Sequence, residues 1–282
     1  MGRFTGKTAV ITGSGRRGGL GFAIAKRLAE DGANIVISDI GQSRDEHTGA
    51  DHIGSTDEME SIAEELRGLG VKSSTCVCDV RSLEEVRALA KHAAETHGSL
   101  DIWVNNAGIG YIMKPLLDVT EEDWRAVIDV NLTGAFFGLK SAAEIMVEQA
   151  KSGQKGGRII NIASQAAKSG FTHAQAYTSS KHGLVGLTRS AAIELGGFGI
   201  TVNNVCPNHV TTGLGAWQNE YFSKVVGAKN VEEYLAAMRA KIPMGRSGLP
   251  EDTANAVAFL CSDEAQYITA ESLNVSGGEE PH

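Results

Sequence analysis

The sequence predicts one α/β domain in which helices cover both faces of a doubly wound parallel β-sheet. Short apolar runs alternate with helical stretches along the whole chain, and this alternation is typical of a sheet of about seven parallel strands. A chain of 282 residues can bury one large core. Because the sequence shows no repeat and no linker, residues 1–282 are expected to form a single domain.

The first elements place a glycine-rich turn between a strand and a helix. Residues 7–12 are predicted to be a strand, residues 13–21 are rich in glycine, and residues 22–30 have helical periodicity. A second strand at 34–39 ends on Asp39. Glycines let the backbone approach a pyrophosphate, and the start of a helix offers free N–H groups. This order of elements predicts a dinucleotide-binding site.

Asp39 is the residue on which the choice of cofactor depends. A carboxylate there can accept hydrogen bonds from the adenosine ribose hydroxyls, and its charge repels a 2′-phosphate. Arg16 and Arg17 argue weakly in the other direction, since arginine suits phosphates, although such a residue is more often solvated or on the pyrophosphate. We therefore predict NAD as the cofactor.

The rest of the chain supplies the remaining strands and helices. Further strands are predicted near 72–77, 101–105, 158–163, 199–205 and 272–275. Helices are predicted near 57–69, 82–97, 121–150, 174–196 and 250–261. Residues 208–247 are the longest segment without a clear strand, and we expect them to form a lid over the substrate.

Ser164, Tyr177 and Lys181 have a spacing that suits proton transfer. Tyr177 and Lys181 stand four residues apart in a predicted helix, so they lie on one face. A nearby ammonium lowers a tyrosine pKa that is normally about 10, so Tyr177 could exchange a proton near neutral pH. Ser164 ends a predicted strand, where its hydroxyl can donate to a substrate oxygen. The Tyr-x-x-x-Lys pattern recurs by chance, and the dinucleotide fingerprint is what favours a functional role.

Taken together, these residues resemble the short-chain dehydrogenase/reductase family over about residues 4–278. The motifs that carry the resemblance are Thr12-Gly13 with Gly19-Leu20-Gly21, Asn105-Asn106-Ala107-Gly108, Val130-Asn131-Leu132-Thr133-Gly134, the Ser164, Tyr177 and Lys181 set, Pro207–Thr212, Leu249–Asp252 and Val275–Gly278. The resemblance implies a Rossmann fold and an enzyme that interconverts a secondary alcohol and a ketone.

The resemblance also implies a role for each catalytic residue. Tyr177 is the general acid or base, and Lys181 lowers its pKa and holds the nicotinamide ribose. Ser164 donates to the reacting oxygen, and Asn131 anchors a water that links Lys181 to solvent. The implied cofactor-binding residues are Gly13, Arg17, Gly19, Leu20, Asp39, Ile40, Asp79, Val80, Asn106, Ala107, Gly108, Tyr177, Lys181, Pro207, Val210 and Thr212. Among these, Asp79 is expected at the adenine, with a helix N-cap as its alternative role.

The sequence departs from the family pattern in several places. The stretch between Gly13 and Gly19 is longer than usual, which leaves the path of the turn open. Asn208 replaces a glycine, so a side chain projects beside the nicotinamide. The polar segment from Ile40 to about Thr56 is additional, and we expect a surface loop near the adenosine end.

The substrate prediction rests on polar residues near the catalytic ones. Gln165 and His173 lie between Ser164 and Tyr177, and Asn208 and His209 follow Pro207. We predict these four as substrate contacts, although each histidine could equally be a satisfied residue that touches no substrate. Apolar walls are expected from Phe171, Trp217, Tyr111 and Met113. The many polar groups indicate a small hydroxylated substrate such as a polyol or sugar derivative.

Composition narrows the partners and the location. The formal net charge is −8 and there is no basic stripe, so neither nucleic acid nor an anionic membrane is an expected partner. A first strand that begins by residue 7 leaves no room for a signal peptide, so we expect a cytoplasmic protein. The four cysteines are expected to be reduced, and no metal site is predicted. By resemblance, and from the small residues of the helices near 121–150 and 174–196, we expect a homotetramer.

Two alternative functions share this fold. One is an NADPH-dependent 3-oxoacyl-carrier-protein reductase, against which Asp39 and the lack of an evident basic docking surface argue. The other is a non-catalytic regulator that senses a dinucleotide, against which the intact Ser164, Tyr177 and Lys181 argue.

Overall fold

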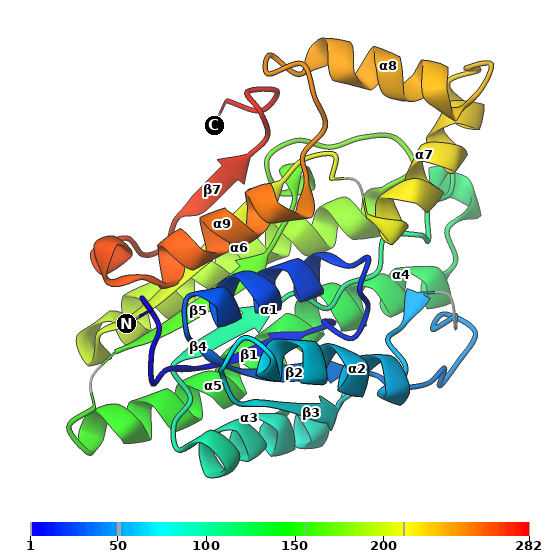
Figure 1. Cartoon of the computed structure of the whole chain (residues 1–282). Coiled ribbons are helices and arrows are strands. Elements are labelled where there is room, and N and C mark those ends of the chain that lie inside the picture. The colour runs from blue at the N-terminus through cyan, green and yellow to red at the C-terminus, as the bar shows by residue number, and fades with distance from the viewer. Residues whose placement is uncertain (1, 50–51, 155, 211, 282) are drawn as a thin grey trace.

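The computed structural model describes residues 2–49, 52–154, 156–210 and 212–281. In these residues one parallel sheet runs in the order β3-β2-β1-β4-β5-β6-β7 (Figure 1). Its strands are β1 Thr8–Thr12, β2 Asn34–Asp39, β3 Ser73–Val77, β4 Ile102–Asn105, β5 Gly157–Ile162, β6 Ile200–Pro207 and β7 Ser272–Val275. The predicted fold class is therefore confirmed.

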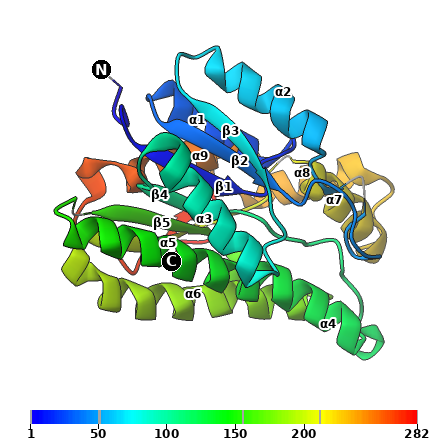
Figure 2. The same ribbon diagram turned by 90° about the horizontal axis from the view of Figure 1, so that it is seen from below.

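Helices cover both faces of this sheet (Figure 2). One layer holds α1 Leu20–Glu30, α2 Thr56–Arg67 and α9 Pro250–Cys261, and the other holds α3 Leu83–His97, α5 Gly134–Lys151 and α6 Gln175–Leu195. Side chains of a strand point alternately to the two faces. Accordingly, Ala9 and Ile11 of β1 join the core under α1, whereas Val10 joins the core under α5. Both cores are apolar, which is why the strands appear as continuous hydrophobic runs.

The helix predicted at 121–150 is interrupted. It consists of α4 Glu121–Ile128, a π-helical turn at Asp129–Thr133, and α5. A π turn carries an extra residue per turn and is frequent at functional sites. Here the turn holds Asn131, whose side chain accepts from the backbone N–H of Ile109 at 2.8 Å and donates to the Ile109 carbonyl at 2.9 Å.

Two segments extend beyond the sheet and its helices. Residues 208–247 contain α7 Gly213–Val225 and α8 Val231–Lys241, which Figure 1 shows at one end of the molecule. The segment that follows β2 leaves the sheet at Asp39 and returns to begin α2, with an isolated bridge between Gly41 and Ser55.

A buried chain of polar side chains, which the sequence did not predict, crosses four strands. Asn105 of β4 donates to the Asn161 Oδ1 on β5 at 2.8 Å, and Asn161 donates to the Thr188 Oγ1 on α6 at 2.8 Å. Thr188 donates to the Asn204 Oδ1 on β6 at 2.7 Å, and Asn204 donates to the Ser272 Oγ on β7 at 2.9 Å. Such satisfied networks specify a unique packing of the elements they join.

Candidate active site

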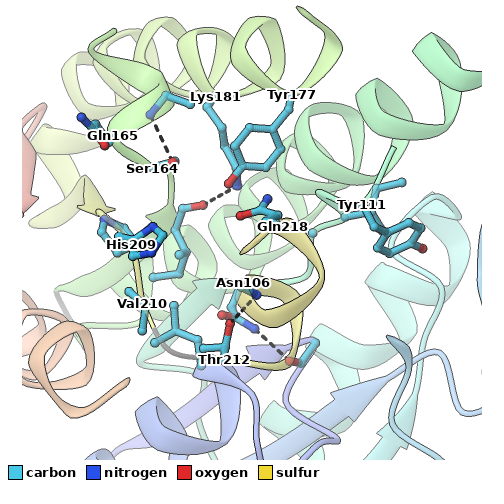
Figure 3. Close-up of a pocket in the computed structure, with 18 of the residues that line it drawn as sticks. Asn106, Tyr111, Ser164, Gln165, Tyr177, Lys181, His209, Val210, Thr212 and Gln218 are labelled. Carbon is cyan, nitrogen blue, oxygen red and sulfur yellow. Dashed lines mark hydrogen bonds between the residues drawn. The ribbon is translucent and has the colours of Figure 1, made fainter. Parts of the chain in front are cut away.

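A cavity of about 740 Å³ lies at the carboxyl ends of the strands, where ligands bind in open α/β sheets. Its lining joins the ends of distant strands, and Figure 3 shows part of it. The predicted site residues in the lining are Gly13, Gly19, Leu20, Asp39, Ile40, Asp79, Val80, Asn106, Ala107, Gly108, Ser164, Gln165, Tyr177, Lys181, Pro207, Asn208, His209, Val210 and Thr212.

Tyr177 and Ser164 face this cavity from different elements (Figure 3). Tyr177 belongs to α6, whereas Ser164 follows the end of β5. The Ser164 Oγ accepts from the backbone N–H of Ala166 at 3.1 Å, so its own proton can be donated elsewhere. Burial raises the pKa of Tyr177, and a hydrogen bond with Ser164 opposes that rise.

Lys181 is buried one helical turn from Tyr177. Its Nζ lies 5.5 Å from the centroid of the Tyr177 ring and donates to the Ile162 carbonyl at 2.8 Å. Burial lowers the pKa of Lys181 to about 8. Burial of the phenol is the largest cause of the shift in the Tyr177 pKa, and the Lys181 ammonium donates to a carbonyl, so the lowering of the Tyr177 pKa by Lys181 stays a prediction.

Asn131 lies behind the cavity rather than in its lining. It is buried, and its Nδ2 also donates to the Ser180 Oγ at 3.3 Å. A Cβ built on Gly108 would lie 3.3 Å from the Asn131 Oδ1 and 3.8 Å from the Lys181 Nζ. Asn131 and Lys181 therefore approach the backbone at the same residue, Gly108. That a water held by Asn131 links Lys181 to solvent stays a prediction.

The glycine turn and the start of α1 have the shape that a dinucleotide requires. Gly13 has a φ of 64°, and a Cβ there would lie 2.7 Å from the Ala107 Cα. Gly19 occupies the N-cap of α1 and the first turn carries no acid, so no side chain of that turn competes for the helix N–H groups. These features fit a pyrophosphate at the helix start.

Asp39 is held by backbone amides at the far end of the cavity. One carboxylate oxygen accepts from Gly15 N–H at 3.0 Å and the other from Ile40 N–H at 2.9 Å, and the Gly54 amide adds a further hydrogen bond. Burial nevertheless raises the pKa of Asp39. A Cβ on Gly54 would lie 2.5 Å from Gly15, so the segment after β2 packs directly on the glycine turn.

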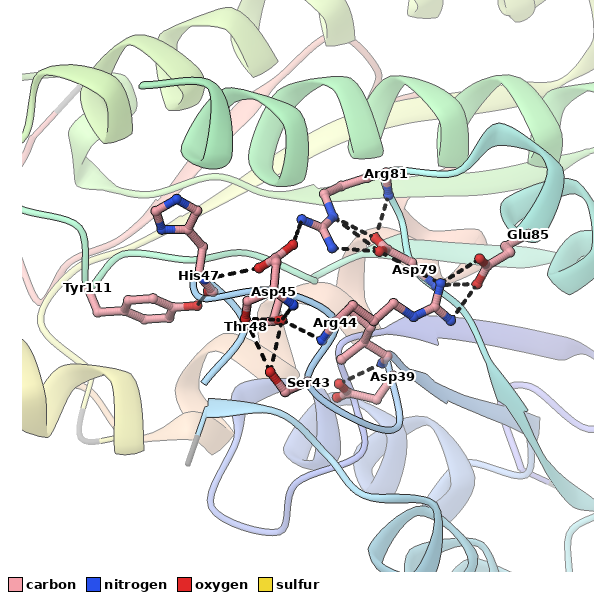
Figure 4. A network of polar contacts seen from close by, with 11 residues as sticks. Asp39, Ser43, Arg44, Asp45, His47, Thr48, Asp79, Arg81, Glu85 and Tyr111 are labelled. Atoms are coloured by element: carbon pink, nitrogen blue, oxygen red, sulfur yellow. Dashed lines mark hydrogen bonds and ion pairs between the residues drawn. The ribbon is translucent and has the colours of Figure 1, made fainter. Parts of the chain in front are cut away.

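Ion pairs hold that segment against the start of α3 (Figure 4). Arg44 donates to both Glu85 oxygens at 2.6 and 3.0 Å. Arg81 pairs with Asp79 at 2.7 Å and also with Asp45. The carboxylate of Asp79, expected at the adenine, lines the cavity but is engaged by Arg81.

The same segment forms part of the cavity wall. Thr48, His52 and Ile53 line the cavity, and the His52 ring stacks on Tyr111 with centroids 4.3 Å apart. The Tyr111 hydroxyl donates to the His47 carbonyl. The sequence predicted a surface loop here, whereas the structure makes the loop a wall of the site. The charges of Arg44 and Arg81 were a signal, but Arg44 pairs with Glu85 and Arg81 pairs with Asp45, and in each pair the partner lies about one helix away along the chain.

Arg17 and His173 are corrected by the structure. The Arg17 guanidinium turns away from the cavity toward α2, where it pairs with Glu65 and donates to the Ser61 Oγ at 2.9 Å. The neighbouring Arg16 lines the cavity instead. His173 does not belong to the cavity lining. Its Nδ1 lies 2.9 Å from the hydroxyl of Tyr221, which also lies outside the lining.

The substrate side of the cavity is built partly from residues that the sequence did not predict. Of the expected apolar walls, Phe171 and Tyr111 line the cavity, whereas Met113 and Trp217 pack in the aromatic cluster beside it. Helices α7 and α8 add Gln218, Asn219, Phe222, Tyr234, Ala237, Met238 and Lys241, and Val226 follows the end of α7. Periodicity along the chain cannot reveal which face of these helices lines the cavity.

Within the described part of the chain, no group of three or more His, Cys, Asp or Glu side chains could hold a metal ion. The four cysteines are free thiols. No helix in the described ranges combines the length and the apolar character that crossing a membrane requires.

Comparisons with known proteins agree with this architecture. Residues 13–280 match the family model described as "Enoyl-(Acyl carrier protein) reductase". The chain is 36% identical over 272 residues to 3-oxoacyl-(acyl-carrier-protein) reductase FabG of Staphylococcus aureus, covering 96% of this chain and 97% of that protein.

Two solved structures resemble the fold closely. Carveol dehydrogenase from Mycobacterium avium, in complex with NAD, aligns with a TM-score of 0.91 and 30% identity over 100% of both chains. A variant of the actinorhodin polyketide ketoreductase with NADPH aligns with a TM-score of 0.85 and 35% identity over 99% of both chains.

The match of motifs, sheet order, cavity and relatives over nearly the whole length leads to one conclusion. The chain belongs to the short-chain dehydrogenase/reductase family and is an oxidoreductase that acts on CH–OH groups.

Proposed function

We propose that the protein is an NAD-dependent oxidoreductase that interconverts a secondary alcohol and a ketone, with Tyr177 as general acid or base. The observation that carries this proposal is the shared cavity. It has Tyr177 and Ser164 at one end, Asp39 at the other, and the glycine turn between them. We also propose that the protein is cytoplasmic, as expected from the sequence.

The proposed chemistry follows from the positions of these side chains. Tyr177 takes the hydroxyl proton when the alcohol is oxidised and returns it when the ketone is reduced. The Ser164 hydroxyl donates to the same oxygen and stabilises the charge that develops on it. Lys181, buried behind them, holds the nicotinamide ribose and passes protons toward Asn131. When bound, NAD supplies the acceptor for the hydride.

The preference for NAD over NADP rests on Asp39. Its carboxylate lines the cavity at the end of β2, where the adenosine ribose is expected. Relatives differ on this point, because the carveol dehydrogenase structure holds NAD and the ketoreductase structure holds NADPH. Asp39 favours NAD, since a carboxylate repels the 2′-phosphate of NADP.

The double variant Asp39→Ala/Ile40→Arg is expected to shift the kcat/KM ratio from NAD toward NADP by tenfold or more. The change removes the acceptor for the ribose hydroxyls and adds a cation for the phosphate. Each charged hydrogen bond is worth roughly 1.5–3 kcal/mol. Measuring kcat/KM for both cofactors in both proteins checks it. A wild-type protein that prefers NADP would show that Arg16, which also lines the cavity, outweighs Asp39.

For the substrate we propose a secondary alcohol that carries a further hydroxyl group on a compact body. The polar residues Gln165, Asn208 and His209 support the hydroxylated substrate predicted from the sequence. Phe171 and Phe222 add an apolar wall that suits a ring or a branched chain better than an open sugar.

A substrate panel tests the proposed function directly. Wild-type protein is assayed with NAD⁺ at alkaline pH on polyols, cyclic diols, simple secondary alcohols and hydroxy acids. A parallel assay reduces a 3-oxoacyl thioester with NADPH, as the similarity to FabG requires. Oxidation of neutral alcohols with NAD⁺ supports the proposal. Activity confined to the thioester and NADPH would replace it with the reductase function.

We also propose a homotetramer. Small residues on the outer helices permit close packing between copies, and symmetric interfaces are common among enzymes. Exposed apolar side chains at Phe136 of α5 and Ile193 of α6 suit such an interface. Light scattering at micromolar concentration should give four times the mass of one chain, 29.7 kDa. A monomer mass would contradict the proposal.

A further inference from the structure

The segment that follows β7 turns back over the carboxyl end of the sheet and is fixed there. The Asn274 side chain and the Ser276 hydroxyl both donate to the Glu280 carbonyl, at 2.9 and 3.1 Å. Gly277 and Gly278 have φ values of 62° and 94°, which make the tight turn possible. The Gly277 carbonyl accepts from Met244 N–H at 3.1 Å, so the turn is packed under the end of the α8 segment.

The two acids at the end of this turn have different surroundings. Glu280 is anchored to the segment that follows Ser164, where its carboxylate accepts from the Ser169 Oγ at 2.9 Å and from the Gln165 side chain at 3.5 Å. Glu279 instead lines the cavity, and its carboxylate accepts from the Asn208 amide. Glu280 therefore holds the turn in place, and Glu279 presents a charge to the substrate side.

Among the described residues, no lysine or arginine lies within ion-pair distance of the Glu279 carboxylate, although Lys241 lines the same cavity. Asn208 satisfies one oxygen with a single hydrogen bond, and a carboxylate can accept about four. A negative group at a cavity wall with unused acceptor capacity is suited to a neutral hydrogen-bond donor.

His209 completes the polar end of the cavity. Its Nε2 is buried and, among the described residues, has no hydrogen-bond partner, although the ring lines the cavity. Burial lowers the pKa of His209, against the opposing effect of the Glu279 charge. A neutral imidazole can accept or donate one hydrogen bond at Nε2, according to its tautomer.

We propose that Glu279 is a substrate-binding residue that selects a second hydroxyl group on the substrate and excludes carboxylates. The second hydroxyl donates to the Glu279 carboxylate, while the reacting hydroxyl lies at Tyr177 and Ser164. The class of substrate is therefore a neutral diol, or the hydroxyketone formed from it. This inference rests on the proposed dehydrogenase function and names the substrate class of the same site.

The variant Glu279→Gln tests the inference, because it keeps the shape and removes the charge. The probes are trans-1,2-cyclohexanediol, cyclohexanol and 3-hydroxycyclohexanecarboxylate, each oxidised with NAD⁺. We expect kcat/KM for the diol, relative to cyclohexanol, to fall by about tenfold or more, as for one lost charge-assisted hydrogen bond. We expect kcat/KM for the hydroxy acid, relative to cyclohexanol, to rise, because the variant no longer repels the carboxylate of the substrate.

Glu271→Gln is the matched control. Glu271 lies just before β7, is exposed, and does not line the cavity. Its variant should leave both substrate ratios unchanged, and the urea midpoint of Glu279→Gln should match that of the wild type.

Two results would overturn the inference and leave the proposed function intact. An active wild type whose substrate ratios are the same in Glu279→Gln shows that Glu279 does not contact substrate. An equal loss of kcat/KM on all three probes shows that Glu279 only supports the fold of the turn. Absence of any NAD⁺-linked oxidation by the wild type would instead overturn the proposed function, and the inference with it.

Discussion

Replacing Tyr177 with phenylalanine is expected to lower kcat by about 10²–10⁴-fold, the range found for general acid–base catalysis. The substitution keeps the ring, which packs beside Phe171 with centroids 6.3 Å apart and lies near Lys181. It removes only the oxygen that exchanges the proton. Affinity for NAD(H), measured by fluorescence titration, should stay nearly intact, since the loss falls on the chemical step.

Ser164→Ala provides the comparison for this variant. It removes a donor to the reacting oxygen but leaves the proton acceptor, so it should lower kcat less than Tyr177→Phe if the roles are as proposed. Near-normal turnover of a correctly folded Tyr177→Phe protein would exclude Tyr177 as the acid or base. The raised pKa of the buried phenol predicts that the wild-type rate of oxidation increases with pH until the phenolate forms.

The variant Gly138→Ala is expected to lower the free energy of unfolding by about 2–5 kcal/mol. A Cβ at this position of α5 would lie 2.0 Å from the Asn105 Oδ1 and 2.7 Å from the Trp103 Nε1. Those two atoms form a buried hydrogen bond of 2.6 Å. Overpacking costs about 1–3 kcal/mol, and a disrupted buried hydrogen bond costs a similar amount.

Gly186→Ala is the matched control, because it makes the same change within a helix of the same layer. Nothing lies within 4 Å of a Cβ at Gly186 in α6. The change should be neutral or stabilise the protein by up to about 1 kcal/mol, since alanine favours a helix. Urea denaturation midpoints of the two variants check this. Equal midpoints would show that α5 shifts to accommodate the added methyl group at little cost.

The close contact between Gly138 and Asn105 could not be predicted from the sequence. In the sequence, Gly138 is one glycine inside a predicted helix, and Asn105 belongs to the Asn105–Gly108 motif. Their contact depends on how closely α5 approaches β4, which is a property of the packed sheet. The chain of amides from Asn105 to Ser272 has the same origin, because its members lie on four strands and one helix.

Features encoded in neighbouring residues were predictable. The alternation of apolar runs predicted the parallel sheet, and the order of glycine turn, helix and Asp39 predicted residues that line one cavity, where we propose that the dinucleotide binds. The spacing of Tyr177 and Lys181 placed both on one face of α6, as found. Each of these depends on the helical or strand period, which acts over a few residues.

Features that depend on partners far along the chain were decided by the tertiary structure. Arg17 was expected at the cofactor but pairs with Glu65, because α2 brings that acid to the outer side of the glycine turn. The segment after β2 became a cavity wall through the pairing of Arg44 with Glu85. Glu279 meets Asn208 although the two are 71 residues apart. A residue's own type gives its charge and hydrogen-bonding capacity, but the packing of distant elements selects which partner satisfies it.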